Sequence, residues 1–260
     1  MKYELIATAT FGLEAVVKME LQDLGYSVVK VEDGKVTFIG DERAIVHTNM
    51  WLRTADRVYI KVAEFNAETF EELFQQVRGI GWEDFLTVDA AFPVVGTSVK
   101  STLHSVPSCQ SIIKKAIVSR LSDFYVQNHF DETGANYRIR FSILKNHVTL
   151  LLDTSGAGLH KRGYRAVDVA APMKETLAAA LVRLSFWKEG VMRRDKDNPD
   201  HVARILVDPC CGSGTILIEA AMMARNIAPG LNRKFAAMAW DFIPEELWNE
   251  ERQAAYNAVD

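Results

Sequence analysis

Residues 205–219 combine the residue types that a nucleotide-like cofactor site needs. The apolar residues 205–207 precede Asp208, and Gly212 and Gly214 follow closely. An apolar, helix-periodic segment over 216–223 comes next. Glycine lets the backbone turn tightly and approach a ligand, and the first turn of a helix presents unbonded N–H groups to an anion. We therefore expect a strand, a glycine turn and a helix, with a ligand at the carboxyl end of the strand.

Two common cofactor loops fit this run poorly. A dinucleotide fingerprint has a third glycine where this sequence has Leu217, and a phosphate loop has a lysine that follows neither glycine here. The pattern Asp-Pro-x-x-Gly-x-Gly-Thr over 208–215 instead resembles the S-adenosylmethionine (SAM) loop of class I methyltransferases. Backbone amides of such a turn can hold the carboxylate of SAM, and Asp208 can accept hydrogen bonds from its ammonium group. An ordinary strand-to-helix turn is the alternative.

The cysteines and the first apolar run point to a cytoplasmic protein. Cys210 and Cys211 are adjacent, which suits neither zinc spacing nor a disulfide framework, so we expect no metal and a reducing compartment. The apolar run over 5–13 is too short to span a bilayer and is flanked by Glu4 and Glu14, so we expect no membrane partner.

Charge is distributed unevenly along the 260 residues, whose net charge is −4. Residues 1–89 hold 9 Lys and Arg against 16 Asp and Glu, whereas residues 90–174 hold 11 against 5. Residues 90–122 and 134–152 contain no acidic residue. A basic region within an acidic chain favours a polyanion such as RNA as the partner, although a solvated face with no partner would have the same composition.

The first 65 residues are expected to form a β-α-β-β-α-β layer. The predicted strands cover 3–9, 26–31, 35–39 and 58–65, and a hairpin turns at Asp33-Gly34. Thr10 and Asp41 are the predicted N-caps of the two helices.

The next hundred residues predict a second α+β layer. Helices are expected over 69–78 and 111–128, a strand over 91–102, and a hairpin of 137–144 with 147–152. Lys114 and Lys115 fall on or beside the polar side of the second helix, and Arg138 and Arg140 share one sheet face. This arrangement suits contacts with a phosphate backbone.

A third region begins near Arg165. Pro172 is expected to open a helix that runs to Trp187, and a charged surface loop follows over 189–201. The strand and glycine turn come next, and the last predicted helix covers 244–259.

Four motifs in order carry a resemblance that covers the entire chain. They are Leu-Leu-Asp-Thr-Ser-Gly at 151–156, Leu-His-Lys-Arg-Gly-Tyr-Arg at 159–165, Ala-Pro-Met-Lys-Glu-Thr-Leu-Ala at 171–178 and the run at 208–221. Together they resemble the THUMP-containing rRNA methyltransferases of the large-subunit guanine-N2 type, whose members are also labelled N6-adenine-specific methylases.

The resemblance implies an α+β ferredoxin-like segment (1–65) and a THUMP RNA-binding domain (66–165). The start of an α/β Rossmann-like class I methyltransferase domain (166–260) follows them. It also implies that SAM is the cofactor and structured RNA the partner. The residues expected to bind SAM are Pro172, Met173, Lys174, Thr176, Asp208, Pro209, Cys210, Gly212, Ser213, Gly214 and Thr215. Those expected to bind RNA are Lys100, Lys114, Lys115, Arg138, Arg140, Lys161, Arg162 and Arg165.

The family's catalytic motif, Asn-Pro-Pro-Tyr, does not occur in this sequence. We therefore predict no catalytic residue within it and expect the chain to be an inactive amino-terminal portion whose catalytic motif lies beyond residue 260. The expected activity of the whole enzyme is methyl transfer to the exocyclic N2 of a guanine in 23S rRNA. An RNA-binding module without catalysis and an adenine-N6 methylase are the alternatives.

Overall fold

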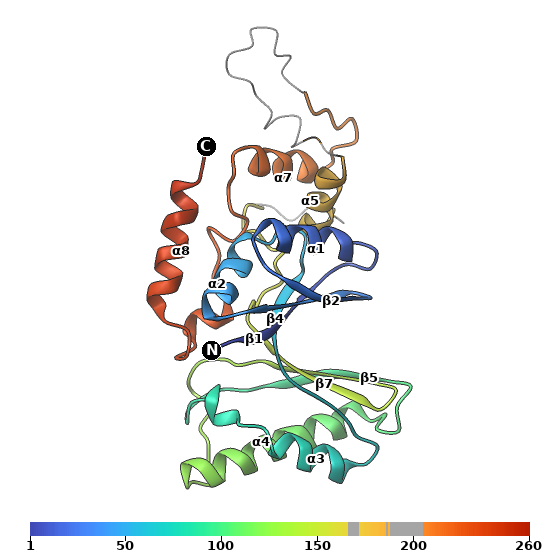
Figure 1. Cartoon of the computed structure of the whole chain (residues 1–260), viewed down its shortest axis with the longest axis vertical. Helices are drawn as coiled ribbons and strands as arrows, with labels where there is room; N and C mark the ends of the chain where they lie inside the picture. The colour runs from blue at the N-terminus through green and yellow to red at the C-terminus, as the bar shows by residue number, and fades with distance from the viewer. Residues whose placement is uncertain (166–171, 186, 188–204) are drawn as a thin grey trace. The chain divides into compact units, whose positions relative to one another are not determined.

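The computed structural model describes residues 1–165, 172–185, 187 and 205–260 (Figure 1). Contacts divide the chain into two compact units. Unit 1 comprises Met1–Val58, Ala157–Phe235 and Glu245–Asp260, and unit 2 comprises Tyr59–Gly156 and Ala236–Pro244. The first segment of the chain thus shares a unit with residues that follow 156, and the predicted boundaries at 65 and 165 stay a prediction.

The amino-terminal part of unit 1 is an antiparallel sheet with two helices. Strands β1 (Tyr3–Thr8), β2 (Val28–Glu32) and β3 (Lys35–Gly40) lie in the order β2-β3-β1. Helices α1 (Glu14–Asp23) and α2 (Glu42–Trp51) accompany them. The hairpin turns at Asp33-Gly34 as predicted, with Gly34 at φ 73°. The Asp41 side chain caps α2 by accepting a hydrogen bond from the Ala44 amide, also as predicted.

The predicted N-cap at Thr10 is wrong. Helix α1 begins at Glu14, and Leu13 occupies its N-cap position without a side-chain hydrogen bond. Gly12, at φ 88°, turns the chain before the helix starts. The Glu14 carboxylate instead accepts hydrogen bonds from the amides of Gly34 and Gly12. These bonds, that of Gly34 first, lower the pKa of Glu14.

Unit 2 contains a four-stranded sheet covered by two helices. Its strands follow the order β4-β7-β6-β5: β4 (Arg57–Asn66), β7 (His147–Asp153), β6 (Ile139–Leu144) and β5 (Val94–Val99). Strands β5 and β6 are parallel, and the other pairs are antiparallel. Helices α3 (Phe70–Arg78) and α4 (Val106–Tyr125) lie on one face of this sheet (Figure 1). Short 3-10 helices cover Trp82–Asp84 and Ala236–Ala239.

The predicted hairpin and both predicted helices of this unit form, with one shifted boundary. Lys145 and Asn146 turn the hairpin with φ of 50° and 66°. Helix α4 begins at Val106, five residues before the predicted start, because Ser105 caps it and Pro107 occupies its first turn.

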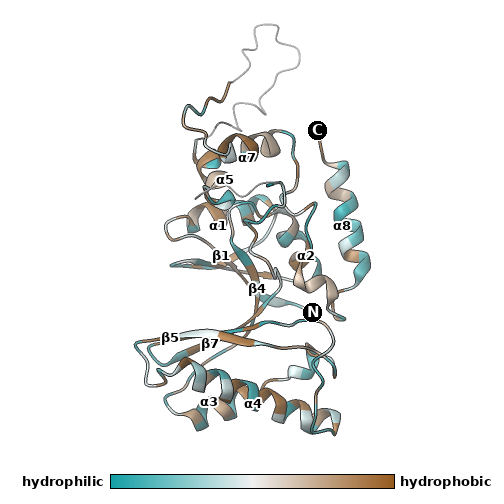
Figure 2. Cartoon of the chain, turned by 180° about the vertical axis from the view of Figure 1, so that it is seen from behind, coloured by the Kyte–Doolittle hydropathy of each residue, from teal (hydrophilic) through white to brown (hydrophobic). Residues whose placement is uncertain are grey.

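Three further helices complete unit 1. They are α5 (Glu175–Leu184), α7 (Thr215–Ala224) and α8 (Glu245–Asn257). Helix α7 is strongly apolar (Figure 2) and packs on α5 through Ala179, Val182, Ala220 and Met223. The helix predicted over 244–259 is confirmed as α8. Within the part of the chain that the structure describes, no helix has the length and apolar character of a membrane span.

Two predictions for this region are wrong, and one lies outside the described residues. Residues 205–208 form no strand, and Ile205 and Val207 are 82% and 74% exposed. A strand requires a paired neighbour, and no described strand pairs with this segment. Pro172 lies before rather than within the helix, since α5 begins at Glu175 with Lys174 as N-cap. The charged loop predicted over 189–201 falls within 188–204, which the structure does not describe.

Candidate functional site

The glycine turn before α7 has the backbone geometry of a ligand-binding loop. Gly212 and Gly214 have φ of 53° and 74°, and Gly214 donates a backbone hydrogen bond to the carbonyl of Cys211 at 2.7 Å. The Asp208 side chain accepts a hydrogen bond from the Cys210 amide at 3.1 Å. A Cβ atom built at Gly212 would meet nothing within 4 Å, so open space lies beside the turn. Helix α7 starts at Thr215 and directs its first N–H groups towards the turn.

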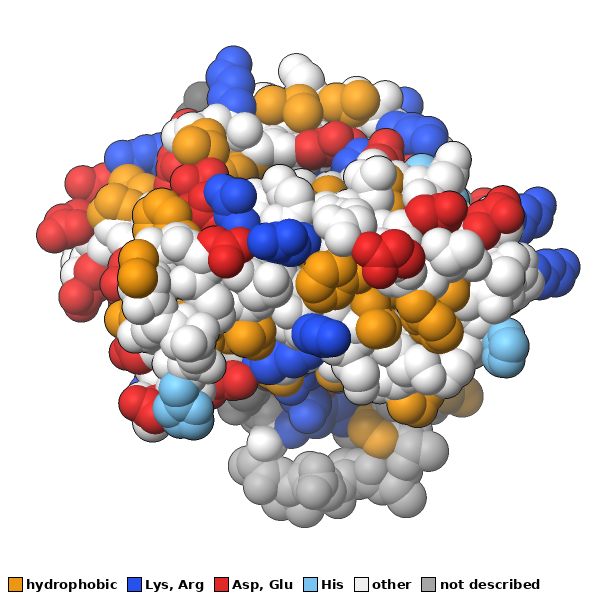
Figure 3. Space-filling model, turned by 90° about the horizontal axis from the view of Figure 1, so that it is seen from below, with side chains coloured by type: hydrophobic (Ala, Val, Ile, Leu, Met, Phe, Trp, Pro, Cys, Tyr) orange, Lys and Arg blue, Asp and Glu red, His pale blue; other side chains and the backbone are white. Residues whose placement is uncertain are grey.

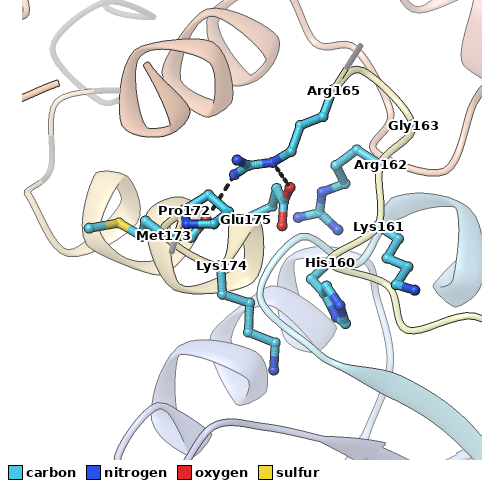
Figure 4. Close-up of a pocket in the computed structure, with 9 residues that line it drawn as sticks. All are labelled: His160, Lys161, Arg162, Gly163, Arg165, Pro172, Met173, Lys174 and Glu175. Carbon is cyan, nitrogen blue, oxygen red and sulfur yellow. Dashed lines mark hydrogen bonds and ion pairs between the residues drawn. The ribbon is translucent and has the colours of Figure 1, made fainter. Parts of the chain in front are cut away.

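The segment before α5 lines a cavity of about 460 Å³ (Figure 4). The lining residues are 160–163, 165 and 172–175. They include Pro172, Met173 and Lys174 of the predicted cofactor segment and Lys161 of the predicted RNA-binding set. The sequence therefore identified part of the lining, although cofactor binding by these residues stays a prediction.

Arg165 connects this segment to the glycine turn. Its Nε donates to Glu175 Oε1 at 2.5 Å, and its Nη2 donates to the Met173 carbonyl and to Thr215 Oγ1, both at 2.9 Å. A longer contact of 3.3 Å joins Nη1 to Ser213 Oγ. The side chain, predicted to meet RNA, is thus held by four groups of its own unit.

Asp56 holds the same segment from the amino-terminal part of unit 1. Its Oδ2 accepts a hydrogen bond from Lys174 Nζ at 2.7 Å, and its Oδ1 accepts one from Thr176 Oγ1 at 2.9 Å. The side chains of Lys174 and Thr176, both predicted to bind SAM, therefore already have a protein partner. Their predicted role is better met by the placement of their backbone than by these two side chains.

A buried ion pair fixes α7 to the residues before it. Arg162 Nε lies 3.3 Å from Glu219 Oε1, and the two side chains are 1% and 0% exposed. Tyr164 donates a hydrogen bond to the same carboxylate oxygen at 3.1 Å. Arg162 also donates to the carbonyls of Leu159 and Arg53. Because these contacts bury Arg162, it is not available to a phosphate in this structure, contrary to the prediction that it binds RNA.

His160 is a half-buried member of the cavity wall. Burial lowers the pKa of its imidazole, and the nearby Lys174 ammonium lowers it further. The ring is therefore biased towards the neutral form at neutral pH and adds no positive charge to the cavity.

The basic side chains of unit 2 divide into paired and exposed groups. Lys114 forms an ion pair with Glu132 at 2.6 Å and lies 3.5 Å from the centre of the Phe92 ring. Lys100, Lys115, Arg138 and Arg140 are exposed, and none of them takes part in an ion pair among the described residues. The face that carries α3 and α4 shows basic and acidic side chains intermingled rather than one continuous basic patch (Figure 3).

Three residues of the site were missed from the sequence: Asp56, Glu175 and Glu219. Glu219 carried a usable signal, because it is the one acidic residue in the apolar sequence of α7 and such a residue needs a buried partner. Asp56 and Glu175 belong to no spacing pattern that predicts their contacts. Among the described residues, no group of His, Cys, Asp and Glu is arranged to hold a metal ion.

Three family models match the chain in succession. The RlmL ferredoxin-like domain matches residues 4–59, the THUMP domain matches 67–153, and the RMKL-like methyltransferase domain matches 162–259. The order agrees with the fold class expected from the sequence: a ferredoxin-like domain, a THUMP domain and a Rossmann-like methyltransferase domain.

Relatives with these features extend beyond this chain. A Bacillus subtilis protein named "Putative RNA methyltransferase YpsC" is 52% identical over 253 residues, and the match covers 96% of this chain and 62% of the relative. A crystal structure described as that of a predicted N6-adenine-specific DNA methylase from Listeria monocytogenes is 53% identical, with a TM-score of 0.90. That match covers 100% of this chain and 65% of the Listeria chain.

A third relative was crystallised with a product of methyl transfer. The structure of SMU.472, described as "a putative methyltransferase complexed with SAH", is 44% identical to this chain with a TM-score of 0.90. The match covers 100% of this chain and 65% of that one. The chain thus spans slightly less than two thirds of the length of each of these relatives.

Proposed function

We propose that this chain, which belongs to the THUMP-containing methyltransferases, binds structured RNA and SAM for methylation of the RNA. The observation that carries the proposal is the meeting of residues 172–176 with the glycine turn in unit 1. These two segments lie about forty residues apart in the sequence, and Arg165 joins them beside a cavity of about 460 Å³.

The residues present fit the amino acid end of SAM. The space beside Gly212 accepts a ligand atom where any larger residue would place a Cβ. Backbone N–H groups at the start of α7 suit a carboxylate, and the Asp208 carboxylate suits an ammonium group. When bound, SAM supplies an electrophilic methyl group on its sulfonium. The chain's own residues then contribute binding and orientation.

RNA binding is assigned to unit 2 and to Lys161 at the cavity. The exposed side chains of Lys100, Lys115, Arg138 and Arg140 supply cations that phosphates can approach. Lys114 contributes less in this proposal, because Glu132 already neutralises it. A cytoplasmic location accompanies the proposal, since all three cysteines are thiols rather than disulfides.

The target base is the finer part of the proposal. We favour the exocyclic N2 of a guanine in large-subunit 23S rRNA, on the resemblance of the four sequence motifs. Adenine N6 is the second candidate, because the Listeria relative is described as specific for that position. The third reading, an RNA-binding module without catalysis, has no use for a cofactor loop.

The expectation that this chain is an inactive fragment gains no support from the comparisons. The methyltransferase model matches residues 162–259, which is most of the third region. Inactivity therefore stays a prediction that rests only on the missing Asn-Pro-Pro-Tyr motif.

Calorimetry with S-adenosylhomocysteine (SAH) and gel shifts with 23S rRNA fragments test the two binding functions. Binding of both ligands supports the proposal, whereas RNA binding without SAH binding supports the module without catalysis. Tritiated SAM with unmodified rRNA, followed by nucleoside analysis, tests the rest. Label in guanine or in adenine identifies the target base, and label above background from this chain contradicts its expected inactivity.

A further inference from the structure

Arg165 occupies a central position among the residues of the proposed cofactor site. It contacts Glu175 and Met173 at the start of α5, and Ser213 and Thr215 at the start of α7. The dashed lines of Figure 4 show the first two contacts at the edge of the cavity. One side chain thus touches both segments that are proposed to surround the cofactor.

The chemistry of the guanidinium group suits this bridging role. A guanidinium presents five N–H donors in a rigid, planar arrangement, whereas a lysine ammonium is a compact point charge on a flexible stem. Arg165 uses Nε for the Glu175 carboxylate while its two Nη atoms reach the opposite segment. A lysine can replace one of these contacts but cannot span all of them.

Other contacts leave the ends of these helices for Arg165 to fix. The apolar contacts between α5 and α7 involve Ala179, Val182, Ala220 and Met223, which lie beyond the first turn of each helix. Residues 205–208 form no strand that could anchor the glycine turn from its other side. The Glu175 side chain is only 8% exposed, so its charge is held firmly beside Arg165.

We propose that Arg165 is a positioning residue that sets the glycine turn against residues 173–175, so that the site grips the amino acid end of the cofactor. The inference rests on the proposed function, because it names what orients that same site. Arg165 acts through Ser213, Thr215 and Glu175 and is not a catalytic residue.

This role predicts a selective loss of affinity. The turn before α7 is assigned to the carboxylate and ammonium of SAH, which 5′-methylthioadenosine lacks while retaining the adenosine and the sulfur. Displacing the turn should therefore weaken SAH binding and leave 5′-methylthioadenosine binding nearly unchanged. A general loss of folding would weaken both ligands to the same extent.

The experiment compares Arg165→Ala and Arg165→Lys with the native chain by calorimetry against both ligands. Arg183→Ala is the matched control, because Arg183 is also ion-paired in unit 1, and its side chain is 22% exposed against 21% for Arg165. We expect Arg165→Ala to weaken SAH binding about tenfold or more, on loss of several charge-assisted hydrogen bonds. Arg165→Lys should retain part of the affinity, and Arg183→Ala should match the native chain.

The outcomes separate this inference from the function on which it rests. If the native chain binds no SAH, the proposed function fails. If the native chain binds SAH and both folded Arg165 variants bind it equally well, the positioning role fails alone. Equal losses for SAH and 5′-methylthioadenosine also overturn that role. If Arg165→Ala does not fold, the lysine variant gives the same comparison with the charge retained.

Discussion

The ion pair of Arg162 and Glu219 lies where water does not reach either side chain. Removing one partner leaves the other charge buried and unpaired, which typically costs about 3–5 kcal/mol. We therefore expect Glu219→Ala to lower the free energy of unfolding by about that amount, measured by urea denaturation of the chain. Glu219→Gln should cost less, because an amide oxygen can still accept hydrogen bonds from Arg162 and Tyr164.

A charge-free replacement provides the control for this ion pair. In the double variant Arg162→Met with Glu219→Leu, neither charge remains to be desolvated, so much of the lost stability should return. If Glu219→Ala unfolds at the same urea concentration as the native chain, the pair is not buried as the structure has it.

Asp56 should stabilise the start of α5 through its bonds to Lys174 and Thr176. Loss of hydrogen bonds to a charged group costs about 1.5–3 kcal/mol, so Asp56→Ala should lower the free energy of unfolding within that range. Asp23→Ala is the control, because Asp23 pairs with Arg183 at the surface and is 65% exposed. An exposed pair contributes under about 1 kcal/mol. Equal effects of the two variants in urea denaturation would contradict the assignment.

At the scale of single residues, the sequence predicted types of contact better than partners. The positive φ angles of Gly212 and Gly214 follow from their place in a turn that only glycine adopts easily. The partners of Arg162 and Arg165 could not be predicted, because they depend on which acidic residue the fold brings near. A basic residue beside a glycine motif looks the same in sequence whether a phosphate or a carboxylate neutralises it.

Strand β6 and the residue before it present the exposed arginines from which RNA binding is best tested. We expect Arg138→Ala with Arg140→Ala to reduce the salt dependence of RNA affinity by roughly 0.9 log units per lost contact on duplex RNA or less on single strands. Gel shifts across a salt series measure this slope. Lys114→Ala should change it little, since Lys114 is paired with Glu132. The same slope for the arginine variant and the native chain would remove this face from the interface.

At the scale of elements, local signals predicted the helices and hairpins, and missing partners explain the failures. Asp33-Gly34 and Lys145-Asn146 form their turns because the required φ angles suit those residues. The apolar run at 205–207 has the composition of a strand, but a strand is stable only beside another. Similarly, residues 90–122 contain no acid, yet Arg120 is paired with Glu83 from outside that stretch.

The division into two units is a property of the whole chain that no local pattern predicts. Residues 1–58 and 157–235 share unit 1 because long-range contacts such as Asp56 with Lys174 and Arg162 with the carbonyl of Arg53 join them. The proposed cofactor site therefore depends on the ferredoxin-like segment for its shape. The proposed RNA-binding side chains lie mainly in unit 2.

This separation predicts that the two ligands can be impaired independently. Gly212→Val should abolish SAH binding, because Gly212 has φ 53° and a side chain there would fill the space left for the ligand. The same variant should bind RNA with native affinity. Arg138→Ala with Arg140→Ala should show the reverse, with weaker RNA binding and unchanged SAH affinity. Both variants are measured by calorimetry with SAH and by gel shift at fixed salt. Loss of both activities in either folded variant would mean that one surface serves both ligands.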